Sequence, residues 1–187
     1  MAVEAEDGRG RTFEADYEVL GLPGSPAGTV EAELIDVGAG LPTDFEAADL
    51  EGRIAMVGSQ NPPDFGRAIN RIEKYARAAR AGAVGFVYSN DDAEGAIPPT
   101  GAVGFTHDGP GEIPAVGVSR EVAARIRRYL ADGSVTATLS VDCHNEPATC
   151  RNVEAVVGPD DGPEILVTGH VDAHDIADGA RDNGAGS

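Results

Sequence analysis

Three side chains near the end of the chain have the types and spacing that a metal site needs. A short apolar run ends in Gly169-His170-Val171-Asp172, and Asp182 follows in a glycine-rich stretch. His170 and Asp172 are two residues apart, so on a strand both point to one face, where one could bind a metal while the other fixes the imidazole tautomer. Asp182 would add a hard oxygen ligand on a loop whose glycines let backbone approach closely. This pattern predicts chemistry at the carboxyl end of a strand, as is common in open α/β sheets.

The whole string of these residues resembles one protein family. Gly-His-x-Asp followed by Gly-Ala-x-Asp-Asn-x-x-Gly-Ser is similar to the first half of the active site in the dizinc aminopeptidases, whose superfamily includes glutamate carboxypeptidase II and the transferrin receptor ectodomain. The resemblance implies that His170 binds zinc, that Asp172 orients it as a catalytic residue, and that Asp182 bridges two zinc ions. Arg181 differs from the acidic residue common at its position. The family's general-base Glu and its other ligands would lie after Ser187, so we expect this chain alone to be inactive.

Other polar residues are expected to take no part in catalysis. His174 and Asp175 follow the motif, but the family pattern does not use them. His107 and His144 are expected in exposed polar loops, and Asp91 on charged loop surface. The sequence contains no Gly-x-Ser-x-Gly element, and neither cysteine has a base nearby in a motif, so nothing supports covalent nucleophilic catalysis.

A second resemblance covers most of the preceding chain. The pattern Asp-x-x-Gly-x-Ile-x-x-Val occupies residues 49–57, and a helix ends in Ala-x-x-Ala-Gly-Ala at 78–83. Gly-x-Val-Tyr at 85–88 and Ile-Pro-Ala-Val-Gly-Val at 113–118 follow. In this order the four segments resemble a protease-associated (PA) domain over residues 14–142. Many members of the aminopeptidase superfamily carry a PA domain ahead of the Gly-His-x-Asp strand, so the two resemblances support each other.

Together they imply an α+β protein, with a PA-type open β-barrel or sandwich carrying two helices, followed by the first strands of an α/β dizinc peptidase domain. Residues 1–13 are expected to form an N-terminal arm that frays around Gly8 and Gly10. The PA domain is expected over residues 14–142. Residues 143–187 are then the N-terminal fragment of a zinc peptidase catalytic domain.

Hydrophobic periodicity and turn residues set the expected elements. Helices are expected over residues 66–81 and 119–130, the second with Ser119 as its N-cap. Residues 38–45 are expected to form a loop. Strands are expected over residues 17–20, 29–37, 49–57, 83–88, 113–118, 134–142, 151–157 and 164–169.

The composition is strongly acidic. The net charge is −18, from 32 acidic and 14 basic residues, and Lys74 is the only lysine. Because the acidic residues are spread along the chain, we interpret them as an adaptation to high salt, where screening weakens their mutual repulsion. Such a surface argues against nucleic acid and anionic membranes as partners. With no apolar run of membrane-spanning length and no signal peptide, a cytoplasmic location is expected.

Two cysteines, Cys143 and Cys150, flank a six-residue loop. Two strands joined by this loop could place them opposite each other, which would allow a disulfide and would suggest export. The alternative is two buried free thiols.

The function implied by the resemblances is that of a zinc-dependent aminopeptidase in its complete form. Two zinc ions would polarise the scissile carbonyl of a peptide substrate and lower the pKa of a bridging water, and a downstream Glu would accept its proton. The alternative is a non-catalytic PA domain that acts as a binding or lid module.

Overall fold

The computed structural model of the 187-residue chain describes residues 2–91, 97–104, 111–158, 162–163 and 165–172. The chain forms two compact units, Met1–Pro147 and Ala148–Ser187. All of the described helices and strands belong to the first unit. No described helix has the length and apolar character required to cross a membrane.

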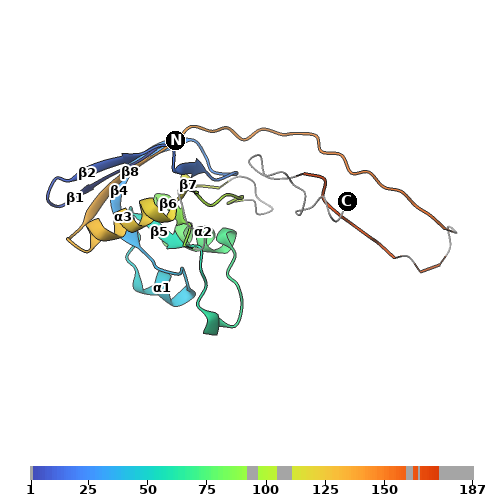
Figure 1. Cartoon of the computed structure of the whole chain (residues 1–187), viewed down its shortest axis with the longest axis horizontal. Coiled ribbons are helices and arrows are strands. Elements are labelled where there is room, and N and C mark those ends of the chain that lie inside the picture. The colour runs from blue at the N-terminus through green and yellow to red at the C-terminus, as the bar shows by residue number, and fades with distance from the viewer. Residues whose placement is uncertain (1, 92–96, 105–110, 159–161, 164, 173–187) are drawn as a thin grey trace. The chain divides into compact units, whose positions relative to one another are not determined.

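The first unit contains one eight-stranded mixed sheet in the order β2-β1-β8-β4-β5-β6-β7-β3, together with short helices (Figure 1). This architecture confirms the expected α+β class with PA-type character. The elements in chain order are β1 Ala2–Asp7, β2 Thr12–Ala15, β3 Val19–Gly21, β4 Gly28–Asp36, α1 Pro42–Ala47, β5 Ile54–Gly58, the 3-10 helix η1 Pro63–Phe65, α2 Arg71–Arg80, β6 Gly85–Ser89, β7 Ala115–Val118, α3 Arg120–Leu130 and β8 Val135–Val141.

Strand β4 joins two halves of this sheet that differ in strand direction. Its first part, residues 28–33, pairs antiparallel with β8, which in turn pairs with the hairpin β1–β2. Its last part, residues 34–36, pairs parallel with β5, and β6 and β7 continue the parallel half. The short strand β3 closes the outer edge of β7 in the antiparallel direction.

The parallel half is buried on both faces, which explains its nearly continuous apolar sequence. In β5, Ile54 and Met56 face a core cluster that includes α3, while Ala55 and Val57 face a second cluster that includes α2. The two sets alternate because successive side chains on a strand point to opposite faces. Phe86 of β6 extends the second cluster and makes an edge contact with a tyrosine of α2 at a ring-centroid distance of 5.4 Å.

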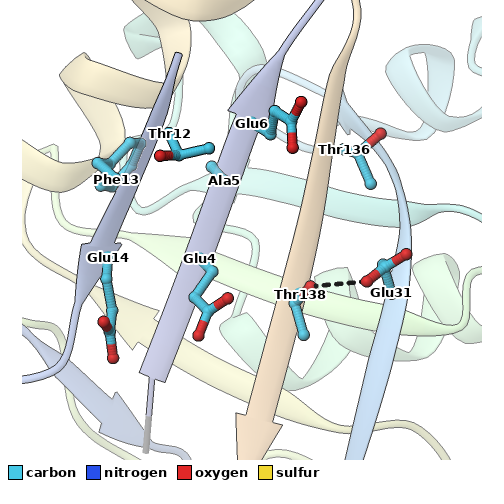
Figure 2. Close-up of a pocket in the computed structure, with 9 residues that line it drawn as sticks. All are labelled: Glu4, Ala5, Glu6, Thr12, Phe13, Glu14, Glu31, Thr136 and Thr138. Atoms are coloured by element: carbon cyan, nitrogen blue, oxygen red, sulfur yellow. Dashed lines mark hydrogen bonds between the residues drawn. The ribbon is translucent and has the colours of Figure 1, made fainter. Parts of the chain in front are cut away.

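The antiparallel half has one buried face and one acidic face. Strand register places Glu14 directly opposite Glu4, Glu4 opposite Thr138, and Thr138 opposite Glu31. Figure 2 shows this row across four strands, with Thr138 donating to Glu31 over 3.3 Å. Nine residues line the hollow on this face, and four of them are glutamates. Like charges placed directly opposite each other on a sheet destabilise it.

Both longer helices begin at side-chain caps. Ser119 Oγ accepts from the Val122 N–H at 3.1 Å, which confirms the expected N-cap of α3. Helix α2 begins later than expected, at Arg71, where the Asn70 side chain accepts the Ile72 N–H. The residues expected to form its first turn cannot do so, because Gly66 has a φ of 83° and ends η1 in the left-handed region.

Helix α1 lies partly where a loop was expected. Pro42 occupies its first turn, where the missing N–H costs nothing, and Phe45 is buried. Asp44 Oδ2 accepts the Leu41 N–H at 2.8 Å. A helix of six residues with one buried aromatic is too short for hydrophobic periodicity to detect.

The expectation of a frayed N-terminal arm is wrong. Residues 2–7 form β1, which pairs on one side with β8 and on the other with β2. The glycines read as fraying lie in the hairpin turn, where the Asp7 carboxylate accepts the backbone N–H groups of Arg9 and Arg11, each at 2.9 Å. The hairpin is held against α3 by aromatic and cationic contacts, in which Phe13 meets Tyr129 edge-on at 5.5 Å.

The strands expected over residues 151–157 and 164–169 are absent from the part of the second unit that the structure describes. Residues 151–157 and 165–169 have no ladder partners among the described residues. Their apolar side chains are exposed: Val153 is 98% exposed and Ile165 is 92% exposed. A strand exists only through hydrogen bonds to a neighbouring strand, and no described segment supplies them.

The acidic face predicts salt-dependent stability. We expect the wild-type melting temperature to rise with KCl concentration. At the lowest salt that keeps the protein folded, Glu4→Gln should raise the free energy of unfolding by about 0.2–1 kcal/mol, because it removes the repulsion from Glu14. In molar KCl, where the Debye length is about 3 Å, the gain should vanish. Thermal melts followed by circular dichroism measure both effects.

Glu46→Gln is the matched control, since Glu46 is exposed on α1. It should change little at either salt. A melting temperature that does not respond to salt, or an equal gain for both variants, would contradict this explanation.

A second prediction concerns Glu73, which bonds to Arg67 at 2.8 Å and to Arg77 at 2.9 Å. These two guanidinium groups lower its pKa from 4.5 to about 2. A lowered folded-state pKa means that the ionised carboxylate stabilises the fold above pH 4.5 and that this stabilisation is lost as the pH falls towards 2. Glu73→Gln should therefore lower stability at pH 6, with a difference from wild type that shrinks on acidification. Urea melts at a series of pH values would show it; a difference independent of pH would count against the ion pairs.

Candidate functional site

His170 and Asp172 interact directly in the structure. His170 Nδ1 lies 3.0 Å from Asp172 Oδ1 and 3.1 Å from the Asp172 backbone oxygen. Both contacts require the proton on Nδ1, so they select the tautomer with the proton on that nitrogen. The side chains are 53% and 85% exposed, respectively. This is the geometry in which a carboxylate orients a metal-binding imidazole.

Asp182 lies outside the described residues, as do His174, Asp175 and His107. In the described part of the chain, no group of three or more His, Cys, Asp and Glu side chains is arranged to hold a metal ion. The structure therefore brings together two of the three predicted site residues. The roles of all three remain predictions.

A polar cluster that sequence reasoning missed lies at the carboxyl edge of the parallel strands. Arg127 of α3 donates from Nε to Asp36 at 2.9 Å, from Nη1 to Asp91 at 3.0 Å and from Nη2 to the Ser89 hydroxyl at 3.2 Å. Burial alone would lower the pKa of Arg127, but the bonds to Asp91 and Asp36 outweigh it and the pKa is raised. Asp91, expected on open loop surface, instead helps to tie α3 to the ends of β4 and β6. Polar residues placed just after parallel strands were the signal available in the sequence.

The only lysine of the chain, Lys74, stabilises the loop after β5 at the same edge of the sheet. Lys74 is fully buried, and its Nζ donates to the carbonyl oxygens of Gly58 at 2.8 Å and Gln60 at 3.3 Å. Any larger residue at Gly58 would force Asp91 to move, because a Cβ there would lie 2.1 Å from Asp91 Oδ2. The loop that follows β5 is thus held by a buried ammonium group.

Next to this cluster lies a surface groove, here called the edge groove, that consists of two adjoining hollows of about 410 and 550 Å³. The hollows share Asp36, Gly38, Ala39 and Pro62. The other lining residues are Ile35, Val37, Leu41, Asp44, Ala47, Ala48, Gln60, Asn61, Pro63, Asp91 and Arg127.

The two cysteines are free, so the bridge considered from the sequence is not formed. The half-buried Cys143 donates its thiol to the Ser25 carbonyl oxygen at 3.0 Å, while Cys150 is exposed. The alternative of two buried thiols is therefore also wrong for Cys150. The loop between them holds no strand pairing among the described residues that would bring the sulfurs together.

The mixed sheet, with helices packed on both faces of its parallel half, places the first unit in the α+β class. Residues 28–126 match the family described as PA domain. The chain belongs to this family, and the matched residues lie within the predicted range 14–142.

Curated relatives are named as peptidases. Carboxypeptidase Q of Rattus norvegicus is 30% identical over 177 residues, which cover 90% of this chain and 37% of that protein. A probable leucine aminopeptidase 2 of Aspergillus oryzae is 30% identical over 141 residues, which cover 74% of this chain and 26% of that protein. The chain thus spans between 26% and 37% of the length of these curated relatives.

Solved structures with the same fold include aminopeptidases. The aminopeptidase from Aneurinibacillus sp. strain AM-1 aligns with a TM-score of 0.56 and 26% identity, over 74% of this chain and 30% of its own. A zinc aminopeptidase from Bacillus subtilis aligns with a TM-score of 0.54 over 74% of this chain and 29% of its own. Its identity of 23% establishes likeness of fold alone.

The cysteine geometry yields a prediction that separates the two thiols. In native protein prepared without reductant, an aromatic disulfide reagent should titrate two thiols, with Cys150 reacting faster because it is exposed and Cys143 slower because it is half-buried and hydrogen-bonded. Cys150→Ser should remove the fast phase and Cys143→Ser the slow one. Protein without titratable thiols after unfolding would instead establish the disulfide.

Proposed function

We propose that the complete protein is a zinc-dependent aminopeptidase that removes N-terminal residues from peptides, and that this chain carries its PA domain and the first part of its metal site. The observation that carries the proposal is the His170–Asp172 pair within the Gly-His-x-Asp sequence, where an oriented imidazole is what a metal ligand needs. Asp182 is the proposed ligand that bridges two zinc ions.

The donor atoms fit zinc chemically. Imidazole nitrogen and carboxylate oxygen are ordinary zinc ligands, and His170 and Asp182 would supply one of each. Zinc bound there would act as a Lewis acid towards a peptide carbonyl. A catalytic zinc takes three protein ligands, so these two residues alone fall short of a complete site. We therefore propose that the present chain is inactive without further ligands.

The relatives support peptide hydrolysis and differ in the peptide end that their names specify. Carboxypeptidase Q and leucine aminopeptidase 2 both align with this chain at 30% identity. The solved structure at 26% identity is called an aminopeptidase. We favour the aminopeptidase activity on that ground. Peptides blocked at the N-terminus and peptides blocked at the C-terminus would distinguish the two activities.

A second candidate is a non-catalytic binding or lid module. It is favoured by the unit Met1–Pro147, in which both hydrophobic core clusters consist only of residues of that unit. In this case the unit would contact a peptide or a partner without any contribution from the metal.

The metal proposal can be tested on this chain through zinc binding. We expect weak zinc binding by isothermal titration, abolished by His170→Ala. His144→Ala is the matched control, because His144 is exposed and lies outside the motif. Binding that survives His170→Ala, or is equally lost in His144→Ala, would contradict the assigned ligand.

Activity is tested by hydrolysis of leucine p-nitroanilide with added zinc. We expect none from this chain and zinc-dependent turnover from a longer protein that includes the downstream region. In the longer protein, Asp172→Asn should reduce activity about 10–100-fold, the usual effect of losing a residue that orients a ligand. Zinc-dependent turnover by the short chain would contradict the incomplete site, and preference for N-blocked peptides with a free carboxyl end would contradict the aminopeptidase assignment.

A further inference from the structure

We propose that the edge groove binds an extended peptide segment that carries a basic side chain between small apolar residues. The groove lies at the carboxyl edge of a parallel sheet, outside the ends of β4 and β5, which is where ligands bind in open α/β sheets. Its lining combines an apolar floor, two side-chain amides and an acidic rim.

The floor is made of small apolar side chains. Ala39, Leu41, Ala48 and Pro62 are half-buried, and Ala47 is exposed at the end of α1. The three alanines among these residues leave room for a peptide backbone, and Leu41 adds apolar surface for it to contact. The Gly38 position adds to this space, because a Cβ there would meet nothing within 4 Å.

The two amides lie beside the ends of the strands with bonding capacity left over. Gln60 donates through Nε2 to the Asp91 backbone oxygen at 3.1 Å, and Asn61 accepts the Ile69 N–H at 3.0 Å. Among the described residues, Gln60 Oε1 and Asn61 Nδ2 have no protein partner. One acceptor and one donor of this kind match the N–H and C=O groups of an extended peptide.

The rim selects a cation. Asp36, Asp44 and Asp91 line the groove, and Arg127 is the one basic residue among the lining residues. Three carboxylates against one guanidinium group leave an excess of negative charge. The contacts to Arg127 and to the start of α1 fix these carboxylates before any ligand arrives, which reduces the ordering cost of binding. Excess negative charge in a fixed geometry repels acidic peptides and nucleic acid and favours a Lys or Arg side chain.

All lining residues belong to the unit Met1–Pro147, and no metal takes part. The inference therefore does not rest on the proposed peptidase activity, and binding can be measured with the chain as it exists.

The test uses fluorescence anisotropy with a labelled peptide of sequence Ala-Pro-Arg-Ala-Pro-Arg-Ala and a matched peptide in which Glu replaces both Arg residues. The measurement is made at the lowest KCl concentration that keeps the protein folded and repeated at a higher one. We expect saturable binding of the basic peptide, weakened by salt, and at least about tenfold weaker binding of the acidic peptide, equivalent to about 1.4 kcal/mol.

The informative variant is Ala47→Arg, which fills the groove and adds positive charge. Its matched control is Ala131→Arg, the same substitution at an exposed position at the end of α3, outside the groove. We expect Ala47→Arg to weaken binding of the basic peptide at least about tenfold and Ala131→Arg to change it less than about twofold.

Absence of binding, equal binding of both peptides, or equal loss in both variants would overturn the proposal. Self-association of the wild-type chain that Ala47→Arg abolishes would also overturn it, because the groove would then hold a second copy of this chain. Sedimentation of both proteins distinguishes that case.

Discussion

The split pairing of β4 is the constraint on which the rest of the first unit depends. One strand pairs antiparallel with β8 through residues 28–33 and parallel with β5 through residues 34–36. It thereby joins a half-exposed hairpin sheet to a fully buried parallel sheet. The N-terminal hairpin can reach its place only because β8 returns beside β4, and the last residue of β4, Asp36, carries the ion pair that fixes α3.

The carboxyl edge of the parallel half is stabilised by charge inside a strongly acidic protein. Lys74 and Arg127 each serve several oxygen acceptors there, so the polar groups left by the ends of the strands are satisfied. Breaking such a network leaves buried groups unpaired, which costs more than the bonds contribute in net terms. A rigid edge of this kind gives the neighbouring edge groove a defined shape. The glutamates of β1, β2 and β4 on the acidic face are instead exposed to solvent.

Sequence reasoning predicted the elements whose signals are local and strong. The buried parallel strands stand out as apolar runs, and the cap of α3 follows from Ser119. Pairing between segments far apart in the sequence could not be predicted in this way. Residues 2–7 form a strand because β8 and β2 pair with them, whereas the charged, glycine-containing turn that follows, taken alone, suggests a frayed end. The same reason accounts for residues 164–169, where an apolar pattern is present but no described strand pairs with it. For the site, the pattern supplied His170 and Asp172, whereas the Arg127 cluster depends on contacts between residues far apart in sequence.

We propose that His170 is a metal ligand oriented by Asp172. The most direct test of this proposal is a crystal structure of a longer protein that includes the downstream region, grown with zinc and measured at the zinc absorption edge. The account predicts an anomalous peak about 2.0–2.2 Å from a ring nitrogen of His170 and from a carboxylate oxygen of Asp182, with Asp172 bonded to the other imidazole nitrogen. A zinc peak elsewhere, with His170 bound to no metal, would contradict it.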